Sequence, residues 1–255
     1  MPNPTALLAL ASLAIASTAQ AASDKPTVVL VHGAFADASS WNGVVAKLSK
    51  DGFPVIAVAN PLRSVQGDAD QVGAVLTSIP GPVVLVGHSY GGAVISAAAA
   101  GRANVKALVY VSAFEPAPGE TSLGLSGKFP GSTLGDTLAP PVALKDGGVD
   151  LYIRQDKFPH QFAADVPQAQ AVLMAATQRP ITQAALTEPQ ARAAWQTIPS
   201  WTIYGTADLN IPPAAMAFMA DRAKSKRTVA VKGASHVVMV SHPGEVAALI
   251  EEAAK

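Results

Sequence analysis

Short runs of apolar, mostly β-branched residues recur along the chain, and most are followed by a stretch with helical spacing. The runs that indicate buried strands are Thr27–Val31, Val55–Val58, Val83–Val86, Ala107–Val111, Trp201–Tyr204 and Thr228–Val231. The helical stretches lie near Ser40–Lys50, Asp68–Ile79, Tyr90–Gly101, Ala214–Arg222 and Pro243–Ala254. Continuously apolar strands separated by helices are typical of a parallel sheet covered on both faces. The pattern predicts an α/β fold with a mostly parallel sheet of about six strands flanked by helices.

The alternation is interrupted once, after the fourth predicted strand, between about Glu115 and Ser200. The first half of this segment is rich in proline and glycine, and the second half has short helical pieces such as Val166–Gln178 and Ile181–Leu186. An insertion of this length at the carboxyl end of a strand is typical of a lid over a binding site. Its apolar and aromatic content, which includes Phe129, favours a packed lid over a flexible surface loop.

The first 21 residues have the pattern of an export signal. Ala6–Ala16 is an apolar segment too short to span a bilayer, and residues 19–21 (AQA) offer a small-x-small cleavage site. No Lys or Arg precedes the apolar segment, and the alternative is a buried first helix. We expect residues 1–21 to be a cleaved signal peptide and residues 22–255 a single domain with its lid at about 115–200. The protein is then periplasmic or secreted.

The composition limits the classes of partner and chemistry. The 255 residues carry a formal net charge of zero, 49% are hydrophobic and 14% are charged. Such a chain can bury one sizeable core, and its neutral balance gives no electrostatic reason to expect a nucleic acid or an anionic membrane as partner. The absence of cysteine excludes a thiol nucleophile and a cysteine-ligated metal. Oligomeric state cannot be read from the sequence.

A serine flanked by glycines directly follows the third predicted strand. Residues 87–92 (GHSYGG) lie between that strand and a helical stretch, with Ser89 in the turn. A strand, a sharp turn and a helix in this order hold the serine in a strained conformation and expose its hydroxyl at the top of the sheet. A β-carbon at Gly87 or Gly91 would collide with a neighbouring strand or helix. The start of the helix also directs free N–H groups toward whatever the serine attacks.

A serine hydroxyl is a poor nucleophile at neutral pH and needs a base that is itself oriented by an acid. In a parallel sheet, the side chains that meet come from the carboxyl ends of different strands. Asp208 follows the fifth predicted strand and His236 follows the sixth, in the chain order Ser, Asp, His. We expect Ser89 to be the nucleophile, His236 the general base and then acid, and Asp208 the residue that fixes and stabilises the imidazolium.

Other residues compete for these roles. His242 could replace His236 as the base, although its position before a proline indicates the entry to the last helix. Glu115, after the fourth predicted strand, could supply the acid in place of Asp208. The remaining histidines are expected to pack, form hydrogen bonds or lie exposed: His32, His88 and His160.

Acyl transfer also needs donors for the negative charge that develops on the substrate oxygen. The backbone N–H groups of Tyr90, next to the nucleophile, and of Ala34, in the loop after the first strand, are the candidates. The sequence shows no metal-ligand spacing, and the residues after the first strand do not match G-x-G-x-x-G. We therefore expect neither a metal nor another cofactor.

Taken together, the serine turn and the loops of Asp208 and His236 make the chain similar to the α/β-hydrolase superfamily over nearly its whole length after residue 21. Residues 31–35 (VHGAF), 205–208 (GTAD) and 233–236 (GASH) make it resemble bacterial relatives of the plant methylesterase and hydroxynitrile lyase group. The resemblance implies the α/β-hydrolase fold and one of two activities, ester hydrolysis or cyanohydrin cleavage.

Two positions distinguish these activities. As the resemblance implies, the lyases carry threonine where this chain has Gly33, and lysine after the catalytic histidine where it has Val237. We therefore expect a serine carboxylesterase for small to medium, mostly apolar esters. Gly33, Phe35, Phe129 and Val237 are its candidate substrate-binding residues. The alternatives are lyase-like or cofactor-free perhydrolase chemistry on the same triad, and a ligand-binding receptor that kept the pocket.

Overall fold

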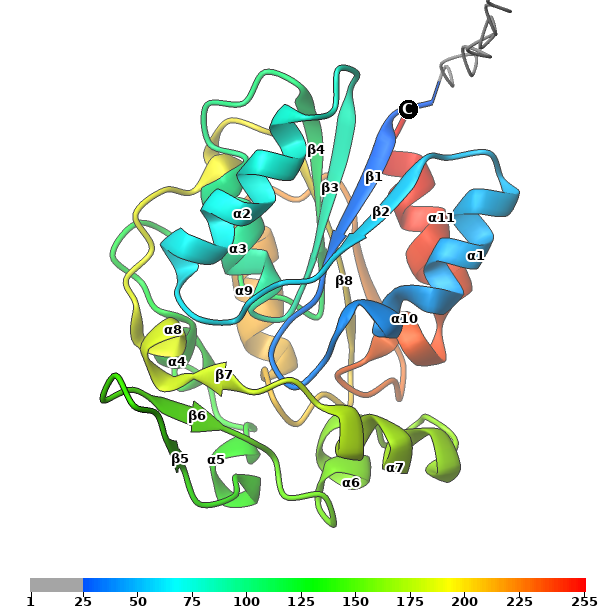
Figure 1. Cartoon of the computed structure of the whole chain (residues 1–255). Coiled ribbons are helices and arrows are strands. Elements are labelled where there is room, and N and C mark those ends of the chain that lie inside the picture. The colour runs from blue at the N-terminus through cyan, green and yellow to red at the C-terminus, as the bar shows by residue number, and fades with distance from the viewer. Residues whose placement is uncertain (1–24) are drawn as a thin grey trace, which may run out of the picture.

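Six parallel strands form the central sheet of the computed structural model, which describes residues 25–255. Their order is β2-β1-β3-β4-β8-β9 (Figure 1). The strands are β1 (Thr27–Val31), β2 (Val55–Val58), β3 (Val83–His88), β4 (Val105–Val111), β8 (Ser200–Gly205) and β9 (Thr228–Val231). The predicted six-stranded parallel sheet is confirmed. The predicted signal peptide, residues 1–21, lies outside the described residues.

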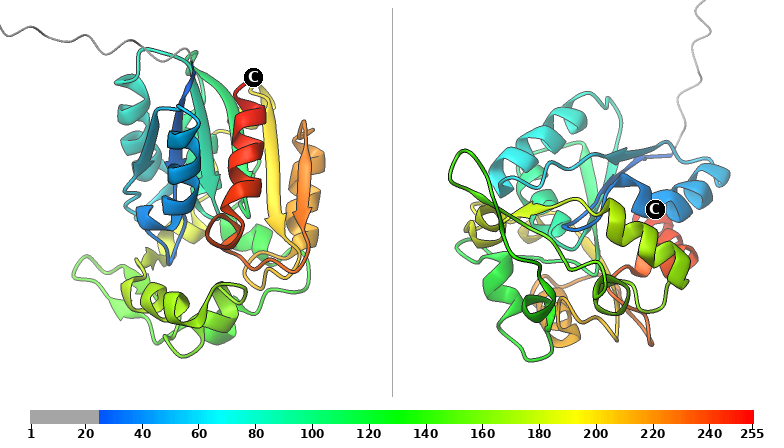
Figure 2. Two further views of the ribbon diagram at one scale, coloured as in Figure 1. Left: turned by 90° about the vertical axis from the view of Figure 1, so that its right-hand side faces the viewer. Right: turned by 60° about the horizontal axis from the view of Figure 1, so that its bottom comes forward.

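Helices cover both faces of the sheet, as Figures 1 and 2 show from different sides. One face carries α1 (Asn42–Lys50), α10 (Val238–Ser241) and α11 (Pro243–Ala253), with the short helix η1 (Ala38–Trp41) before α1; the other carries α2 (Val65–Thr77), α3 (Gly91–Ala98) and α9 (Pro213–Arg222). Every residue of β3 is buried, because this central strand is covered from both sides. No helix within residues 25–255 is long and apolar enough to cross a membrane.

An insertion of short elements separates β4 from β8, and most of it lies at the carboxyl ends of the strands (Figure 1). It contains α4 (Ser122–Ser126), α5 (Leu134–Thr137), β5 (Val142–Ala143), β6 (Val149–Leu151), α6 (Phe158–Phe162), α7 (Gln168–Thr177), β7 (Ile181–Thr182), α8 (Gln183–Thr187) and η2 (Ala194–Gln196). Strands β5, β6 and β7 form a small antiparallel sheet that the sequence pattern did not predict. The expectation of helix from residue 181 is wrong for Ile181–Thr182, which pair with β6. Strands of two or three residues are too short to show an alternating pattern.

Polar contacts tie the insertion to the loop between β2 and α2. The Arg63 guanidinium donates to the Asp150 carboxylate at 2.6 Å, and the Thr182 hydroxyl donates to the Arg63 carbonyl at 2.7 Å. The Glu188 carboxylate accepts the Val65 N–H at 2.6 Å, at the start of α2. Because these contacts join three parts of the insertion to one loop, the insertion is packed against the core of the fold.

Candidate active site

Ser89 lies in the turn between β3 and α3 and has a positive φ of 54°. Few non-glycine residues adopt this conformation, and those that do are concentrated at functional sites. A β-carbon on Gly87 would lie 2.6 Å from the Gly91 carbonyl oxygen, and one on Gly91 would lie 2.5 Å from the Val31 carbonyl oxygen. The expected steric need for glycine on both sides of the serine is therefore confirmed.

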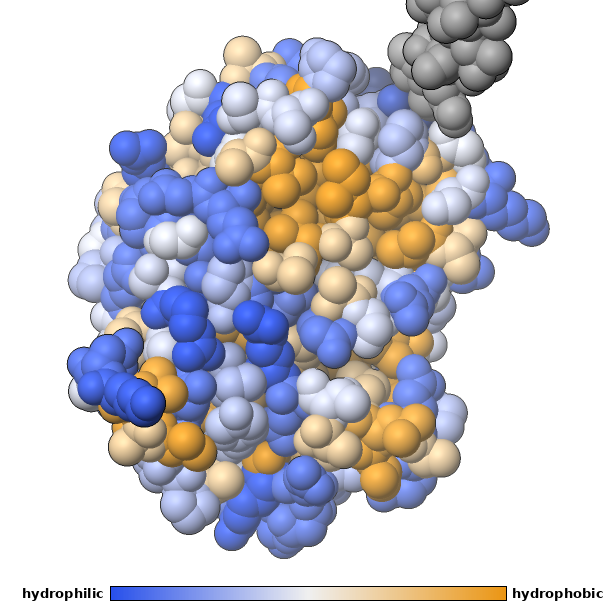
Figure 3. All heavy atoms as spheres, viewed as in Figure 1, coloured by the Kyte–Doolittle hydropathy of each residue, from blue (hydrophilic) through white to orange (hydrophobic). Residues whose placement is uncertain are grey.

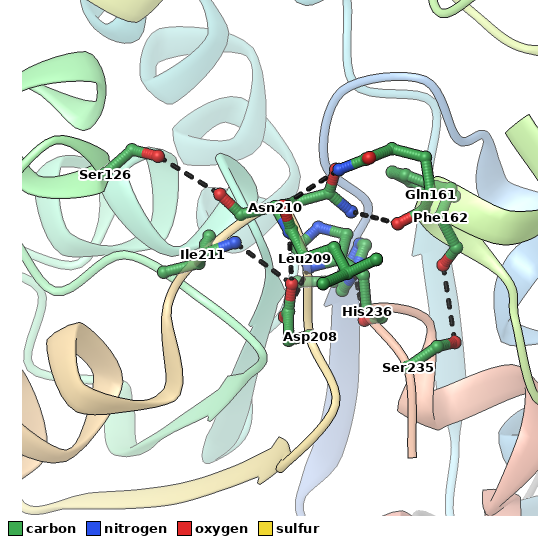
Figure 4. Close-up of polar contacts among 10 residues, drawn as sticks. Ser126, Gln161, Phe162, Asp208, Leu209, Asn210, Ile211, Ser235 and His236 are labelled. Carbon is green, nitrogen blue, oxygen red and sulfur yellow. Dashed lines mark hydrogen bonds and ion pairs between the residues drawn. The ribbon is translucent and has the colours of Figure 1, made fainter. Parts of the chain in front are cut away.

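Asp208 and His236 meet on the loops that follow β8 and β9. The His236 Nδ1 lies 2.7 Å from the Asp208 Oδ2, and both side chains are buried. The other carboxylate oxygen, Oδ1, accepts the backbone N–H groups of Asn210 at 2.8 Å and Ile211 at 3.0 Å (Figure 4). With a carboxylate at Nδ1, this ring nitrogen carries the proton, and the Nε2 lone pair is available to act as a base.

Ser89 and His236 line a common cavity of about 50 Å³. Most of the other lining side chains are apolar: Ala34, Phe35, Phe114, Leu123, Leu134, Phe162, Leu186 and Ile211, with Tyr90, Ser122, Ser126 and Asn210 as polar members. In the described part of the chain no hydrogen bond joins the Ser89 hydroxyl to the imidazole. Such bonds are often long in a free enzyme and shorten when substrate binds.

Neither competitor for the base and acid roles contacts this pair. The His242 Nδ1 lies 2.9 Å from the Ser241 hydroxyl and 3.5 Å from the Asp165 carboxylate, which belongs to the insertion. The Glu115 carboxyl accepts a hydrogen bond from the Thr202 hydroxyl at 3.0 Å and is fully buried. Geometry therefore assigns His242 and Glu115 to other parts of the fold.

His32 holds the loop that follows β1. Its Nδ1 donates to the Gly33 carbonyl at 2.9 Å, and its Nε2 accepts the Asn60 backbone N–H at 3.0 Å. The Asn60 side-chain amide returns a hydrogen bond to the His32 carbonyl at 3.0 Å. Burial lowers the pKa of His32, which keeps the ring neutral and able to accept. The sequence analysis did not single out Asn60, because its partner His32 lies 28 residues away on the loop of another strand.

His88 supports the loop of His236. Its Nε2 donates to the His236 carbonyl at 3.2 Å, and the two ring centroids are 4.8 Å apart. Burial lowers the pKa of His88 well below its usual value, and the neighbouring His236 adds to this effect. His88 is thus a neutral packing residue, in agreement with the sequence expectation, and His160 is exposed, also as expected.

Two backbone N–H groups at the cavity are free to bind an anion. Within residues 25–255, neither the Ala34 N–H nor the Tyr90 N–H has an acceptor, and both residues line the cavity. The Tyr90 hydroxyl donates to the buried Asp68 carboxylate at 3.0 Å, which fixes the side chain of the residue after Ser89. Burial raises the pKa of Asp68. The sequence analysis did not single out Asp68, which lies on the buried face of α2.

The four candidate substrate-binding residues lie in different places. Phe35 lines the cavity, and Gly33 abuts the serine, since a β-carbon on Gly33 would lie 2.5 Å from the Ser89 Cβ. Phe129 packs against Phe218 at a centroid distance of 5.6 Å, in an apolar cluster that also contains Phe114 and Ile211 of the cavity lining, but it does not itself line the cavity. Val237 is fully buried in the main core. Residues 25–255 contain no cluster of three or more His, Asp or Glu side chains placed to hold a metal ion.

The Glu115 carboxyl makes the stability of the protein depend on pH. Burial raises its pKa to about 8, from a usual value of 4.5. Between these values the folded protein binds one proton that the unfolded chain releases, so the group lowers stability as pH rises through this range. We expect Glu115→Gln to gain on the order of 2 kcal/mol over the wild type at about pH 9, and little at about pH 4.5, measured by thermal unfolding.

Glu245→Gln is the matched control for this prediction, because Glu245 is exposed on α11. Because Glu245 lies in the first turn of α11, where a negative charge is favourable, this substitution should slightly lower the unfolding temperature at about pH 9, the opposite sign to Glu115→Gln. Equal unfolding temperatures of Glu115→Gln and wild type at both pH values would show that Glu115 titrates normally.

Comparison with known proteins places this site in a family. A model of the alpha/beta hydrolase family matches residues 28–249. A curated relative, the alpha/beta hydrolase nvfD of Aspergillus novofumigatus (strain IBT 16806), is 25% identical over 250 residues, which cover 90% of this chain and 97% of that protein.

Solved structures share the fold at lower sequence identity. Polyneuridine aldehyde esterase superposes with a TM-score of 0.78 at 20% identity, covering 91% of this chain and 100% of that one. A pyrethroid hydrolase from Sphingobium faniae JZ-2 gives 0.69 at 23%, covering 90% and 97%, and the methylesterase MES16 from Arabidopsis gives 0.72 at 18%, covering 89% and 98%. The family match extends from β1 into α11 and so includes the central sheet. The resemblance seen in the sequence is confirmed: the chain belongs to the alpha/beta hydrolase family.

Proposed function

We propose that this protein is a serine carboxylesterase that cleaves small to medium, mostly apolar esters through an acyl-enzyme. The observation that carries the proposal is the buried Asp208–His236 pair, whose histidine lines an apolar cavity together with a serine at positive φ. Some proteins that share the fold are named as an esterase, a pyrethroid hydrolase and a methylesterase, which agrees with ester cleavage.

The proposed reaction uses each of these groups in turn. The Ser89 hydroxyl attacks the ester carbonyl while His236 Nε2 takes its proton, and the Asp208 carboxylate stabilises the imidazolium. The Ala34 and Tyr90 N–H groups receive the negative charge on the carbonyl oxygen. The imidazolium then protonates the leaving alcohol, and a water activated by His236 releases the acid and frees the serine.

A panel of esters tests this proposal. We expect p-nitrophenyl acetate and butyrate to be hydrolysed, and mandelonitrile to be cleaved far more slowly or not at all. Faster cleavage of mandelonitrile or faster perhydrolysis would favour the alternative chemistry. A ligand that binds tightly and is released unchanged, with no ester turnover, would favour the receptor hypothesis.

The lack of space around Gly33 is evidence against the lyase alternative. A β-carbon at this position would lie 2.5 Å from the Ser89 Cβ and 2.7 Å from the His88 carbonyl oxygen. Threonine, the residue that the resemblance implies for the lyases, would therefore displace the serine turn. With valine at position 237 as well, the site offers no ammonium group for a departing cyanide.

We expect Gly33→Ala to lower kcat/KM for p-nitrophenyl acetate by about 100-fold or more, since shifts of about 1 Å at reacting groups have such effects. The unfolding free energy should fall by about 1–3 kcal/mol from overpacking. Gly81→Ala is the control, because an added β-carbon there meets nothing within 4 Å. Kinetics like those of the wild type in Gly33→Ala would mean that the serine turn tolerates a larger residue here.

A further inference from the structure

Phe35 separates two cavities. It lines the catalytic cavity of about 50 Å³, and it also lines an outer cleft of about 310 Å³ between α7 and the segment that runs from η1 into α1. Phe35 is the one residue common to the two linings, and its own side chain is buried. Phe35 therefore lies at the boundary between the catalytic cavity and the outer cleft.

The volumes of the catalytic cavity and the outer cleft indicate that an ester of medium size must occupy both. Sites for small molecules commonly have volumes of about 300–1,000 Å³. The catalytic cavity, at about 50 Å³, holds only a few atoms next to Ser89, whereas the outer cleft, at about 310 Å³, reaches this range. An ester with one long arm fits only if that arm leaves the catalytic cavity, and the outer cleft lies directly beyond Phe35.

Phe35 is held in place by contacts with the insertion. Its φ is 58°, a sparsely populated conformation for a residue with a side chain. Its N–H donates to the Arg179 carbonyl at 3.0 Å, just after α7 in the chain, and its ring meets Phe162 of α6 edge-on at 6.2 Å. A small shift of α6 and α7 would therefore move Phe35 and change the passage between the two spaces.

The lining of the outer cleft indicates the kind of arm that it takes. Apolar residues gather over α7 in Figure 3, where Leu173 is 67% exposed, and Met174 and Val240 also line the cleft. Serine, threonine and amide side chains make up most of the polar lining. Asp37 is the only charged residue in the lining of this cleft, so an arm that carries a carboxylate is disfavoured.

We propose that Phe35 is a gate and that the outer cleft binds the longer arm of the ester, an arm that is uncharged and largely apolar. This inference rests on the proposed esterase function. Beyond that function, it assigns a second substrate-binding region, the outer cleft, and a residue, Phe35, that determines the chain length of the esters hydrolysed.

Chain-length selectivity in two substrate series tests the gate. The acyl series compares p-nitrophenyl octanoate with the acetate, and the alcohol series compares octyl acetate with ethyl acetate. We expect Phe35→Ala to raise the ratio of kcat/KM for the long over the short ester about tenfold in one of these series, because a side chain between the two spaces has been removed. Met174→Trp enlarges a side chain that lines the outer cleft alone. It should lower the same ratio, and in the Phe35→Ala/Met174→Trp double variant it should remove the gain.

The short esters are an internal control. Damage to the neighbouring Ala34 N–H would lower the rates for short and long esters together and leave the ratio unchanged. Leu123→Trp enlarges a side chain that lines the catalytic cavity and not the outer cleft. If Leu123→Trp lowers the ratio and Met174→Trp does not, or if Phe35→Ala changes neither series, the gate is overturned while the esterase function stands. A wild type without Ser89-dependent ester turnover would overturn the proposed function itself.

Discussion

Ser89→Ala should reduce ester hydrolysis by about 10⁵-fold or more, the scale of loss seen when a serine nucleophile is removed. We expect the substitution to remove the nucleophile without disturbing the turn. Alanine has a β-carbon like serine, so it can adopt the φ of 54° found at this position. The unfolding temperature should therefore stay within about 2 °C of the wild type, since no packing atom other than the hydroxyl is lost. Hydrolysis of p-nitrophenyl butyrate and thermal unfolding measure the two quantities.

Ser78→Ala is the control for this loss. Ser78 lies exposed at the end of α2, where its hydroxyl donates to the Val75 carbonyl at 2.8 Å, and its removal should leave the rate unchanged. Substantial turnover by Ser89→Ala would show that a different nucleophile, or an activated water, attacks the ester.

Asp208→Asn should lower kcat by about 10⁴-fold while the fold is kept, as the same change does in serine proteases. The local contacts explain why. The N–H groups of Asn210 and Ile211 both donate to Oδ1, so the carbonyl oxygen of an asparagine would take that position. Its NH₂ group would then face His236 Nδ1, force the proton onto Nε2 and leave no lone pair to accept the serine proton.

The chain offers a matched control in a second carboxylate–histidine pair. Asp165 lies 3.5 Å from His242, at the boundary between the insertion and the helices after β9. Asp165→Asn should leave kcat within about twofold, as expected for a partly exposed pair remote from the reacting atoms. If Asp165→Asn abolishes hydrolysis and Asp208→Asn does not, His242 is the base.

The main sheet could be predicted closely because its strands are short runs of mostly apolar, β-branched residues between stretches with helical spacing. The predicted ranges of β1, β2 and β9 match the structure to the residue. The meeting of Asp208 with His236 also follows from chain order, since β8 and β9 are neighbours whose carboxyl ends face the same edge.

The insertion could not be predicted in the same way. Its strands span two or three residues and its helices follow no long period, so the path of the chain depends on distant contacts such as Arg63 with Asp150. For this reason the sequence could not show whether an aromatic residue such as Phe129 lines the cavity; in the structure it packs against Phe218, next to the lining residue Phe114. Polar partners from other elements, such as Asn60 for His32, were also out of reach of a pattern along the chain.

Labelling with a fluorophosphonate, followed by peptide mass spectrometry, tests most directly whether Ser89 is an activated nucleophile. The reagent reports on the serine without assuming any natural substrate, and denatured protein measures the background reaction. We predict one phosphonate adduct per chain, located on Ser89, with hydrolysis lost in proportion to labelling and the adduct formed far more slowly in Asp208→Asn. Wild-type protein that hydrolyses esters but carries no adduct on Ser89 would contradict this account.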